Sequence, residues 1–189
     1  MGNAYLPRET VHGWSKAIGA KPEEQVSLMR LLRTQRRLGR FLEENAGQLE
    51  PATGGVVMYL TGVIVRLFEL AGGRMRTASW TQIRDAETRI QEAVGSLLPL
   101  DAELPSRARA VAWRAQPHIL DEALMALFES EGPSEGEEDL PLVESFKVYL
   151  ALWVATEVLD GNWTPPNVFE GLTTYAHVPI DPKDSKVEG

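Results

Sequence analysis

One stretch decides the fold of this chain: VVMYLTGVIVRLFELA, residues 56–71. It is charged only at Arg66 and Glu69, and its apolar residues are not arranged in the strict alternation of a half-buried strand. A helix that is apolar on almost every side belongs in the interior of a protein. We therefore expect a central helix over residues 53–70.

A second apolar stretch, LVESFKVYLALWVATEVL, occupies residues 142–159 and predicts another core helix. Both stretches end on a glycine-containing pair, Gly72-Gly73 and Asp160-Gly161. Each is then followed by a Trp-Thr motif, Ser79-Trp80-Thr81 after the first and Asn162-Trp163-Thr164 after the second. The shared ending indicates a candidate internal repeat, in which each unit buries a face that it cannot bury alone.

The rest of the pattern predicts an all-α fold, a helical bundle of about five main helices. We expect three further helices over residues 23–45, 79–98 and 106–130, the last bent at Pro117 because proline lacks the amide donor of a helix interior. We expect no β-strand. The predicted organisation is an irregular N-terminal arm (1–22), a first helical unit (23–116), a second helical unit (117–175) with a short helix at 167–175, and a tail (176–189).

The composition of the chain limits the kinds of site and the cellular locations that we expect for the protein. The chain has 189 residues and no cysteine, which excludes disulfides, thiolate nucleophiles and cysteine-based zinc sites. The longest apolar run meets Arg66 before it reaches the roughly 20 residues that a membrane span needs. The N-terminus lacks the basic and then apolar pattern of a secretory signal. We expect a cytoplasmic protein that is neither secreted nor membrane-bound.

Charge is distributed unevenly along the chain. Residues 1–116 hold 16 Lys and Arg against 12 Asp and Glu, a balance of +4, whereas residues 117–189 hold 3 against 15, a balance of −12. This asymmetry fits a first half that meets an anionic partner, and it fits equally two halves that attract each other. Ordinary solvated charge is the third interpretation.

The order of a medium helix, a long apolar helix, a basic link and a shorter helix resembles the histone fold. The resemblance is closest over residues 53–104, where Leu70-Ala71-Gly72 and the stretch IQEAVGSLLP at 90–99 are similar to the later half of a core histone. It implies two histone-fold-like units in one chain, contact with nucleic acid, and a nuclear or virion location. The chain departs from the family in having only five lysines and an acidic second half.

A row of arginines is the most concentrated signal for a partner. Its members are Arg30, Arg33, Arg36, Arg37 and Arg40, and their spacing of three and four residues lines most of them along one side of a helix. A row of guanidinium groups attracts phosphate backbones, although many charge runs are only solvated surfaces. Arg74 and Arg76 fall where the histone resemblance implies a phosphate-contacting loop. We therefore predict a nucleic-acid-binding role for all seven.

Catalytic sets are hard to assemble from this sequence. His118 and Glu122 have the spacing of two metal ligands on a helix, but the chain lacks the paired Glu-x-x-His elements of helical di-metal sites. Glu69, Glu144 and Glu157 lie on the most apolar helices, where pairing with Arg66 or Lys147 is commoner than acid–base work. We predict no enzyme, no catalytic residue, no metal site, no cofactor and no small-molecule substrate.

The C-terminal aromatics Trp163, Phe169 and Tyr175 are candidate partner anchors, and docking onto the chain's own bundle is the alternative. We expect a non-catalytic, all-helical interaction or assembly subunit that binds protein partners or itself. The alternative function is a nucleic-acid-associated histone-fold doublet that contacts phosphates through the arginine row.

Overall fold

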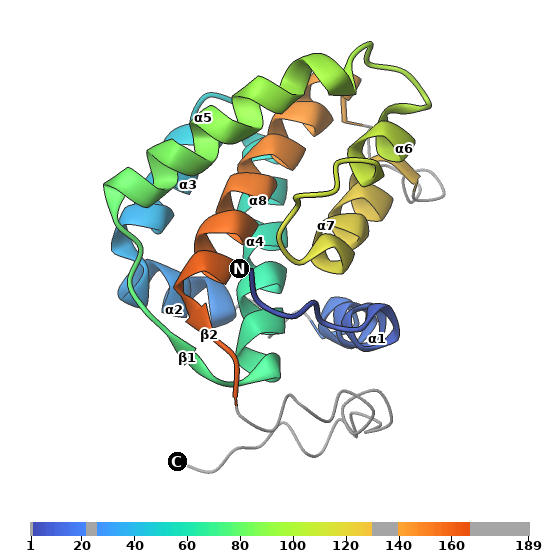
Figure 1. Cartoon of the computed structure of the whole chain (residues 1–189). Helices are drawn as coiled ribbons and strands as arrows, with labels where there is room; N and C mark the ends of the chain where they lie inside the picture. The colour runs from blue at the N-terminus through green and yellow to red at the C-terminus, as the bar shows by residue number, and fades with distance from the viewer. Residues whose placement is uncertain (1, 22–25, 130–139, 167–189) are drawn as a thin grey trace.

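A computed structural model describes residues 2–21, 26–129 and 140–166, and for residues 26–28 it describes the backbone alone. This part of the chain contains eight α-helices, one π-helical turn and a sheet of two short strands, so the predicted all-α fold class is confirmed. Two long helices occupy the centre (Figure 1), with shorter helices on both sides of them. The predicted helices at 53–70 and 142–159 are these two.

The central helices are α4 (Pro51–Ala71) and α8 (Leu142–Asn162). Near their N-terminal ends the hydroxyl of Thr53 donates a hydrogen bond to the carboxylate of Glu144. Beyond their C-terminal ends the indole N–H of Trp163 donates to the carbonyl oxygen of Gly72, 2.7 Å away. Contacts at both ends show that α4 and α8 run parallel, side by side, and end together.

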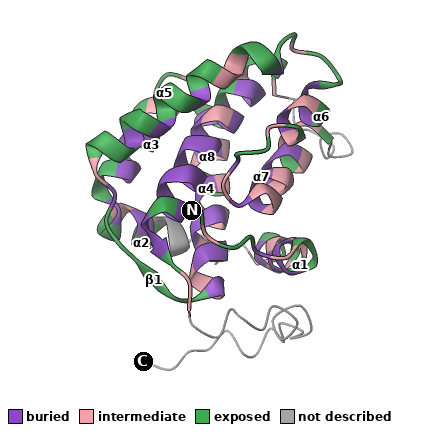
Figure 2. Cartoon of the chain, in the orientation of Figure 1, coloured by how far each residue is buried: buried purple, intermediate pink, exposed green. Residues whose placement is uncertain are grey.

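Burial differs between the two central helices (Figure 2). Every residue of α8 from 151 to 160 is buried, whereas α4 leaves one side partly open, with Tyr59 exposed. Within the described residues α4 is the one helix that is long and apolar enough to cross a membrane, and half of its most apolar window is buried inside the fold. α8 is therefore the most enclosed element.

The predicted helix at 79–98 is α5 (Trp80–Leu97), and Ser79 is its N-cap. The Ser79 hydroxyl accepts from the Gln82 backbone N–H, and the Gln82 side chain accepts from the Ser79 backbone N–H. Such a capping box satisfies two amide groups that the first turn of a helix otherwise leaves open. α5 buries Ile83 and Ile90 and packs along α8.

The single helix predicted over 23–45 is two helices, α2 (Val26–Thr34) and α3 (Arg36–Ala46). Helical geometry is lost at Gln35, where φ is −117° and ψ is 53°. Just before the break, the Thr34 hydroxyl donates to the Arg30 carbonyl oxygen at 2.8 Å, a back-bond that bends helices. The buried Gln35 side chain completes the break by bonding outside its own helix.

The prediction of one bent helix over residues 106–130 is also wrong. The structure has α6 (Leu104–Arg109), an irregular turn, α7 (Pro117–Leu124) and a π-helical turn, η2 (Met125–Glu129). Pro117 begins α7, a position where a missing N–H costs nothing. Gln116 has a φ of 43°, and its buried side chain holds this uncommon conformation by donating to Asp160 Oδ1 at 2.8 Å and to the Ala4 carbonyl oxygen at 3.0 Å.

Two further predictions are corrected by the structure. The N-terminal region contains a helix, α1 (Arg8–Gly19), which buries Val11, Trp14 and Ile18 and is not an irregular arm. The chain also has strands, because β1 (Arg74–Met75) pairs antiparallel with β2 (Trp163–Thr164) directly after the two central helices. The two Trp-Thr motifs therefore differ in structure, since the first begins α5 and the second forms β2.

One apolar core includes residues from both predicted helical units. Phe68 and Ile83 belong to the first unit, Leu120 and Trp153 to the second, and all four join the same buried cluster. The division into units 23–116 and 117–175 stays a prediction. The predicted short helix at 167–175 and the tail lie outside the described residues.

Because residues 151–160 of α8 are buried, truncation within this part should cost far more than the same change at the exposed start of the helix. Leu152 is fully buried and Leu142 is 41% exposed. Leu152→Ala should lower the free energy of unfolding by about 2–5 kcal/mol through lost burial and a cavity. The matched Leu142→Ala change should alter it by no more than about 0.5 kcal/mol. Urea denaturation followed by circular dichroism measures both, and equal effects would contradict the enclosed position of α8.

Candidate functional site

The seven predicted phosphate-binding arginines are exposed and lie on three neighbouring segments. We call this set the arginine face. Its members are Arg30 and Arg33 on α2, Arg36, Arg37 and Arg40 on α3, and Arg74 and Arg76 on or beside β1. The helix break at Gln35 means that the first five do not form the one continuous helical stripe that the sequence predicts. They are nevertheless brought together with the other two.

Gln35 brings the segment after β1 next to α2 and α3. Its side chain is 3% exposed, its Nε2 donates to the Arg76 carbonyl oxygen at 2.7 Å, and its Oε1 accepts from the Ala78 N–H at 2.8 Å. Arg37 adds a bond from Nη1 to the Ala78 carbonyl oxygen at 3.4 Å. The link that follows β1, residues 76–78, is therefore held by hydrogen bonds to the junction between α2 and α3. Sequence reasoning missed Gln35, although it is the one polar residue in the row Leu31, Gln35, Leu38 and Leu42.

Few carboxylates neutralise the arginine face. Arg30 pairs with Glu69 at 3.3 Å, and the exposed Arg40 pairs with Glu44 at 3.5 Å. Within the described ranges, no ion pair is formed by the other five arginines. Exposed pairs of this kind contribute little to stability, and water or another anion readily replaces either partner.

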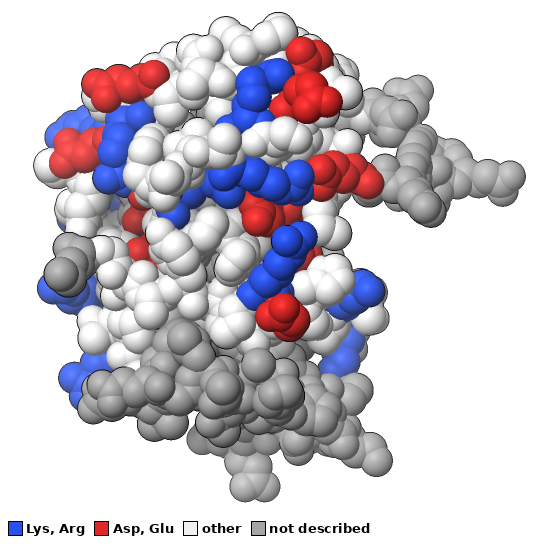
Figure 3. Space-filling view, turned by 45° about the vertical axis from the view of Figure 1, so that its right-hand side comes forward, with Lys and Arg blue, Asp and Glu red and all other residues white. Residues whose placement is uncertain are grey.

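Arginines elsewhere are matched with acids. Figure 3 looks onto the side that carries α1, α6 and α7, where blue and red side chains lie next to each other. Arg109 makes two hydrogen bonds to Glu129, at 2.7 and 2.6 Å, and this pairing lowers the pKa of the Glu129 carboxyl and raises that of Arg109. Arg107 pairs with Asp101 at 2.7 Å in the same region. The arginine face differs in that five of its seven arginines form no ion pair within the described residues.

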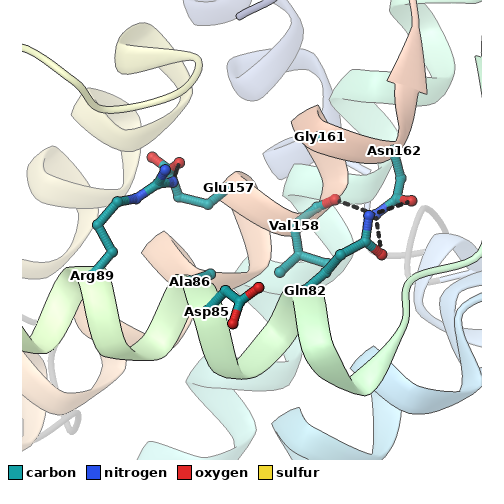
Figure 4. A pocket seen from close by; sticks show the side chains of 8 residues that line it. All are labelled: Gln82, Asp85, Ala86, Arg89, Glu157, Val158, Gly161 and Asn162. Carbon is teal, nitrogen blue, oxygen red and sulfur yellow. Dashed lines mark hydrogen bonds and ion pairs between the residues drawn. The ribbon is translucent and has the colours of Figure 1, made fainter.

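A small hollow of about 190 Å³ lies between α5 and α8 (Figure 4). At one end the side-chain amides of Gln82 and Asn162 bond to each other at 3.2 and 3.3 Å. At the other end Arg89 donates to the carboxylate of Glu157, and the Arg89 guanidinium also covers the ring of Trp113 at 4.8 Å from its centroid. The hydrogen-bonding groups at each end of the hollow are thus paired with each other, which indicates a structural role in joining α5 to α8. We call these contacts the polar seam.

Glu157 is the most buried acid of this seam. Its Oε1 accepts from the Ala115 N–H at 2.7 Å and from the Trp153 indole N–H at 3.1 Å. Burial raises the pKa of the Glu157 carboxyl, and the hydrogen bonds and Arg89 oppose that rise. The expected pairing of Glu69 with Arg66 is found at 3.4 Å, whereas Glu144 bonds to Thr53 and Glu157 to Arg89.

A second polar cluster surrounds Asp121 on α7. Arg114, which is buried, donates to Asp121 at 3.0 Å, and His118 lies 3.8 Å from the same carboxylate. Burial raises the pKa of Tyr149 in this region to about 12. Glu122, which has the spacing of a metal ligand relative to His118 in the sequence, contacts His12 at 2.9 Å. The described residues contain no group of three or more potential metal ligands.

Trp163 packs inside the protein. It is 4% exposed, donates to Gly72 and lies edge-on to Phe68 with ring centroids 5.3 Å apart. Trp163 therefore docks onto the chain's own bundle, the alternative interpretation, and its role as a partner anchor stays a prediction. The other two predicted anchors, Phe169 and Tyr175, lie outside the described residues.

Comparisons with known proteins add no relative, since no family model, curated protein or solved structure matches the chain. The histone resemblance stays a prediction.

The Gln35 bonds predict a measurable coupling between the α2–α3 junction and the link. Gln35→Ala should lower the free energy of unfolding by about 1–3 kcal/mol, because it leaves the buried Ala78 N–H without a partner. It should also speed hydrogen exchange at Ala78 more than at the start of α8. Gln91→Ala, an exposed change on α5, is the control and should do neither. Unchanged exchange at Ala78 would contradict the fastening.

Glu157 predicts a pH-dependent difference in stability. A carboxyl whose pKa is raised by folding stabilises the folded state below its unfolded value, about 4.5, and loses that contribution as the pH rises through the folded value. The wild type should therefore lose stability relative to Glu157→Gln as the pH rises above about 4.5. Urea unfolding over a pH series measures this, with exposed Glu92→Gln as the control. A relative gain would mean that Arg89 outweighs burial.

Proposed function

We propose that this protein is a non-catalytic interaction subunit and that its arginine face binds the phosphate backbone of nucleic acid. The supporting observation is the fastening of the Arg76 link to Gln35, which joins two cationic segments that are far apart in the sequence. Neither segment alone presents more than five arginines. Together they form a broader cationic surface on rigid elements.

The chemistry of this surface suits phosphates. A guanidinium group is always charged and offers a planar set of donors that matches phosphate oxygens. α2 and α3 contain 9 and 11 residues and so extend for roughly 14 and 17 Å. A duplex carries one charge per roughly 1.7 Å of its axis, so a surface of this extent faces several phosphates at once.

The net charge of −8 does not oppose this proposal. Charges further apart than roughly 10 Å are largely screened at 0.1 M salt, so a bound phosphate senses mainly the nearest groups. On the side of the molecule that carries α6 and α7, Asp101, Asp121 and Glu129 are already paired with arginines. The net charge of the arginine face itself is positive.

Removal of one unpaired arginine from each segment tests the proposal. Arg36→Gln with Arg76→Gln should weaken duplex binding irrespective of base sequence, because phosphate contacts carry no sequence information. The slope of log affinity against log salt should flatten by up to about 0.9 for each lost contact. Fluorescence anisotropy with a labelled duplex at several salt concentrations measures both quantities.

The matched control removes the same number of charges from other surfaces. Arg8→Gln with Lys147→Gln changes two exposed cations on α1 and α8 and should leave the affinity and the slope nearly unchanged. Equal losses in both double variants would indicate general charge attraction rather than a defined surface. No salt-dependent binding by the wild type, together with copurification of an acidic protein, would favour a protein partner instead.

A further inference from the structure

We infer that the arginine face takes single-stranded nucleic acid in preference to duplex, and that Trp80 is the platform on which a base stacks; this rests on the proposed function. Proteins that bind single strands combine a cationic track with aromatic rings, because an unpaired base exposes its face for stacking. The arginine face supplies the track. The indole ring of Trp80 supplies the stacking surface beside it.

Trp80 is the tryptophan best placed to receive a base. All five tryptophans lie in the described ranges, and Trp14, Trp153 and Trp163 are buried. Trp113 is exposed, but one side of its ring stacks on Trp153 and the Arg89 guanidinium lies over the ring as well. Trp80 is 36% exposed, and within the part of the chain that the structure describes its ring has no aromatic or cation–π partner.

Helix geometry places Trp80 beside the arginines. Successive helix residues are rotated by about 100°, so Trp80 is about 180° from Arg89, which bonds to α8. It therefore lies on the flank of α5 that is turned away from α8. α3 contacts α5, and Arg37 at the start of α3 donates to the carbonyl of Ala78, two residues before Trp80. The exposed Arg84 is only about 40° from Trp80 around the helix.

The backbone around Trp80 is held in place before any ligand arrives. Ser79 and Gln82 form the capping box on either side of it, and Gln35 fixes Ala78. A ring on a preorganised backbone loses little conformational freedom when it contacts a base. In a duplex the bases are already stacked within the helix, so the same ring has no base face to contact.

The test compares Trp80→Ala with Trp80→Phe and with Leu98→Ala, an exposed apolar truncation just beyond the far end of α5. Anisotropy is measured with an oligodeoxythymidine and with a duplex of equal length at one salt concentration. Trp80→Ala should weaken binding of the single strand by about 5- to 150-fold and binding of the duplex by less than about twofold. Trp80→Phe should retain most of the affinity, and Leu98→Ala should behave as the wild type.

Two further readouts separate stacking from structural damage. Because no charge is removed, the salt slope of Trp80→Ala should equal that of the wild type. In a Trp113→Phe background the single strand should quench tryptophan fluorescence, and Trp80→Phe should abolish that quenching. Melting followed by circular dichroism shows whether each variant is folded.

The outcomes distinguish the two proposals. If the wild type binds neither nucleic acid, the proposed function itself fails. If it binds both, and Trp80→Ala weakens neither or weakens both to the same extent, the arginine face stands and the single-strand inference is overturned. Selective loss of the single strand, with quenching that depends on Trp80, supports it.

Discussion

The parallel pairing of α4 and α8 determines where the strands and the surrounding helices lie. Trp163 secures one end, because its indole bonds to Gly72 while its ring packs against Phe68. Gly73 has a φ of 86°, in the region that favours glycine, and this turn lets β1 come back against β2 immediately after the helices end. The short sheet thus fixes where the link carrying Arg74 and Arg76 begins.

Residues 151–160 of α8 are all buried, so their polar groups need partners inside the protein, because an unpaired buried polar group is costly. Some of these partners come from other segments. The Glu157 carboxylate accepts from the Ala115 N–H and from Arg89, and Asp160 Oδ1 accepts from the side-chain amides of Gln116 at 2.8 Å and Asn3 at 3.4 Å. The side chains of one buried helix therefore organise the N-terminal segment, the turn before α7 and the face of α5. This explains how a chain with many short helices has a single core.

Sequence periodicity was sufficient for elements whose structure is set by a long apolar pattern or a local cap. α4, α8 and the Ser79 cap of α5 are of this kind. It failed where a single side chain bonds to a residue distant in sequence, as at Gln35 and Gln116, because no local pattern records such a partner. α1 was missed for a different reason, since its buried stripe of Val11, Trp14 and Ile18 is too short to stand out among polar neighbours. For the arginine face, the sequence identified the residues but not the junction that gathers them.

Gln35 connects the fold to the proposed binding surface. A leucine would suit the row of Leu31, Leu38 and Leu42 better by hydrophobicity, and burying an amide is favourable only if its bonds are made. Both atoms of this amide bond to the backbone of the link, so they fix the path of the chain without depending on the link's side chains. The side chains of Arg74 and Arg76 are consequently not needed to hold the link in place. Their guanidinium groups are exposed to solvent and can contact a ligand. A surface built this way keeps its charge available, in contrast to Arg107 and Arg109 of α6, which are paired with acids.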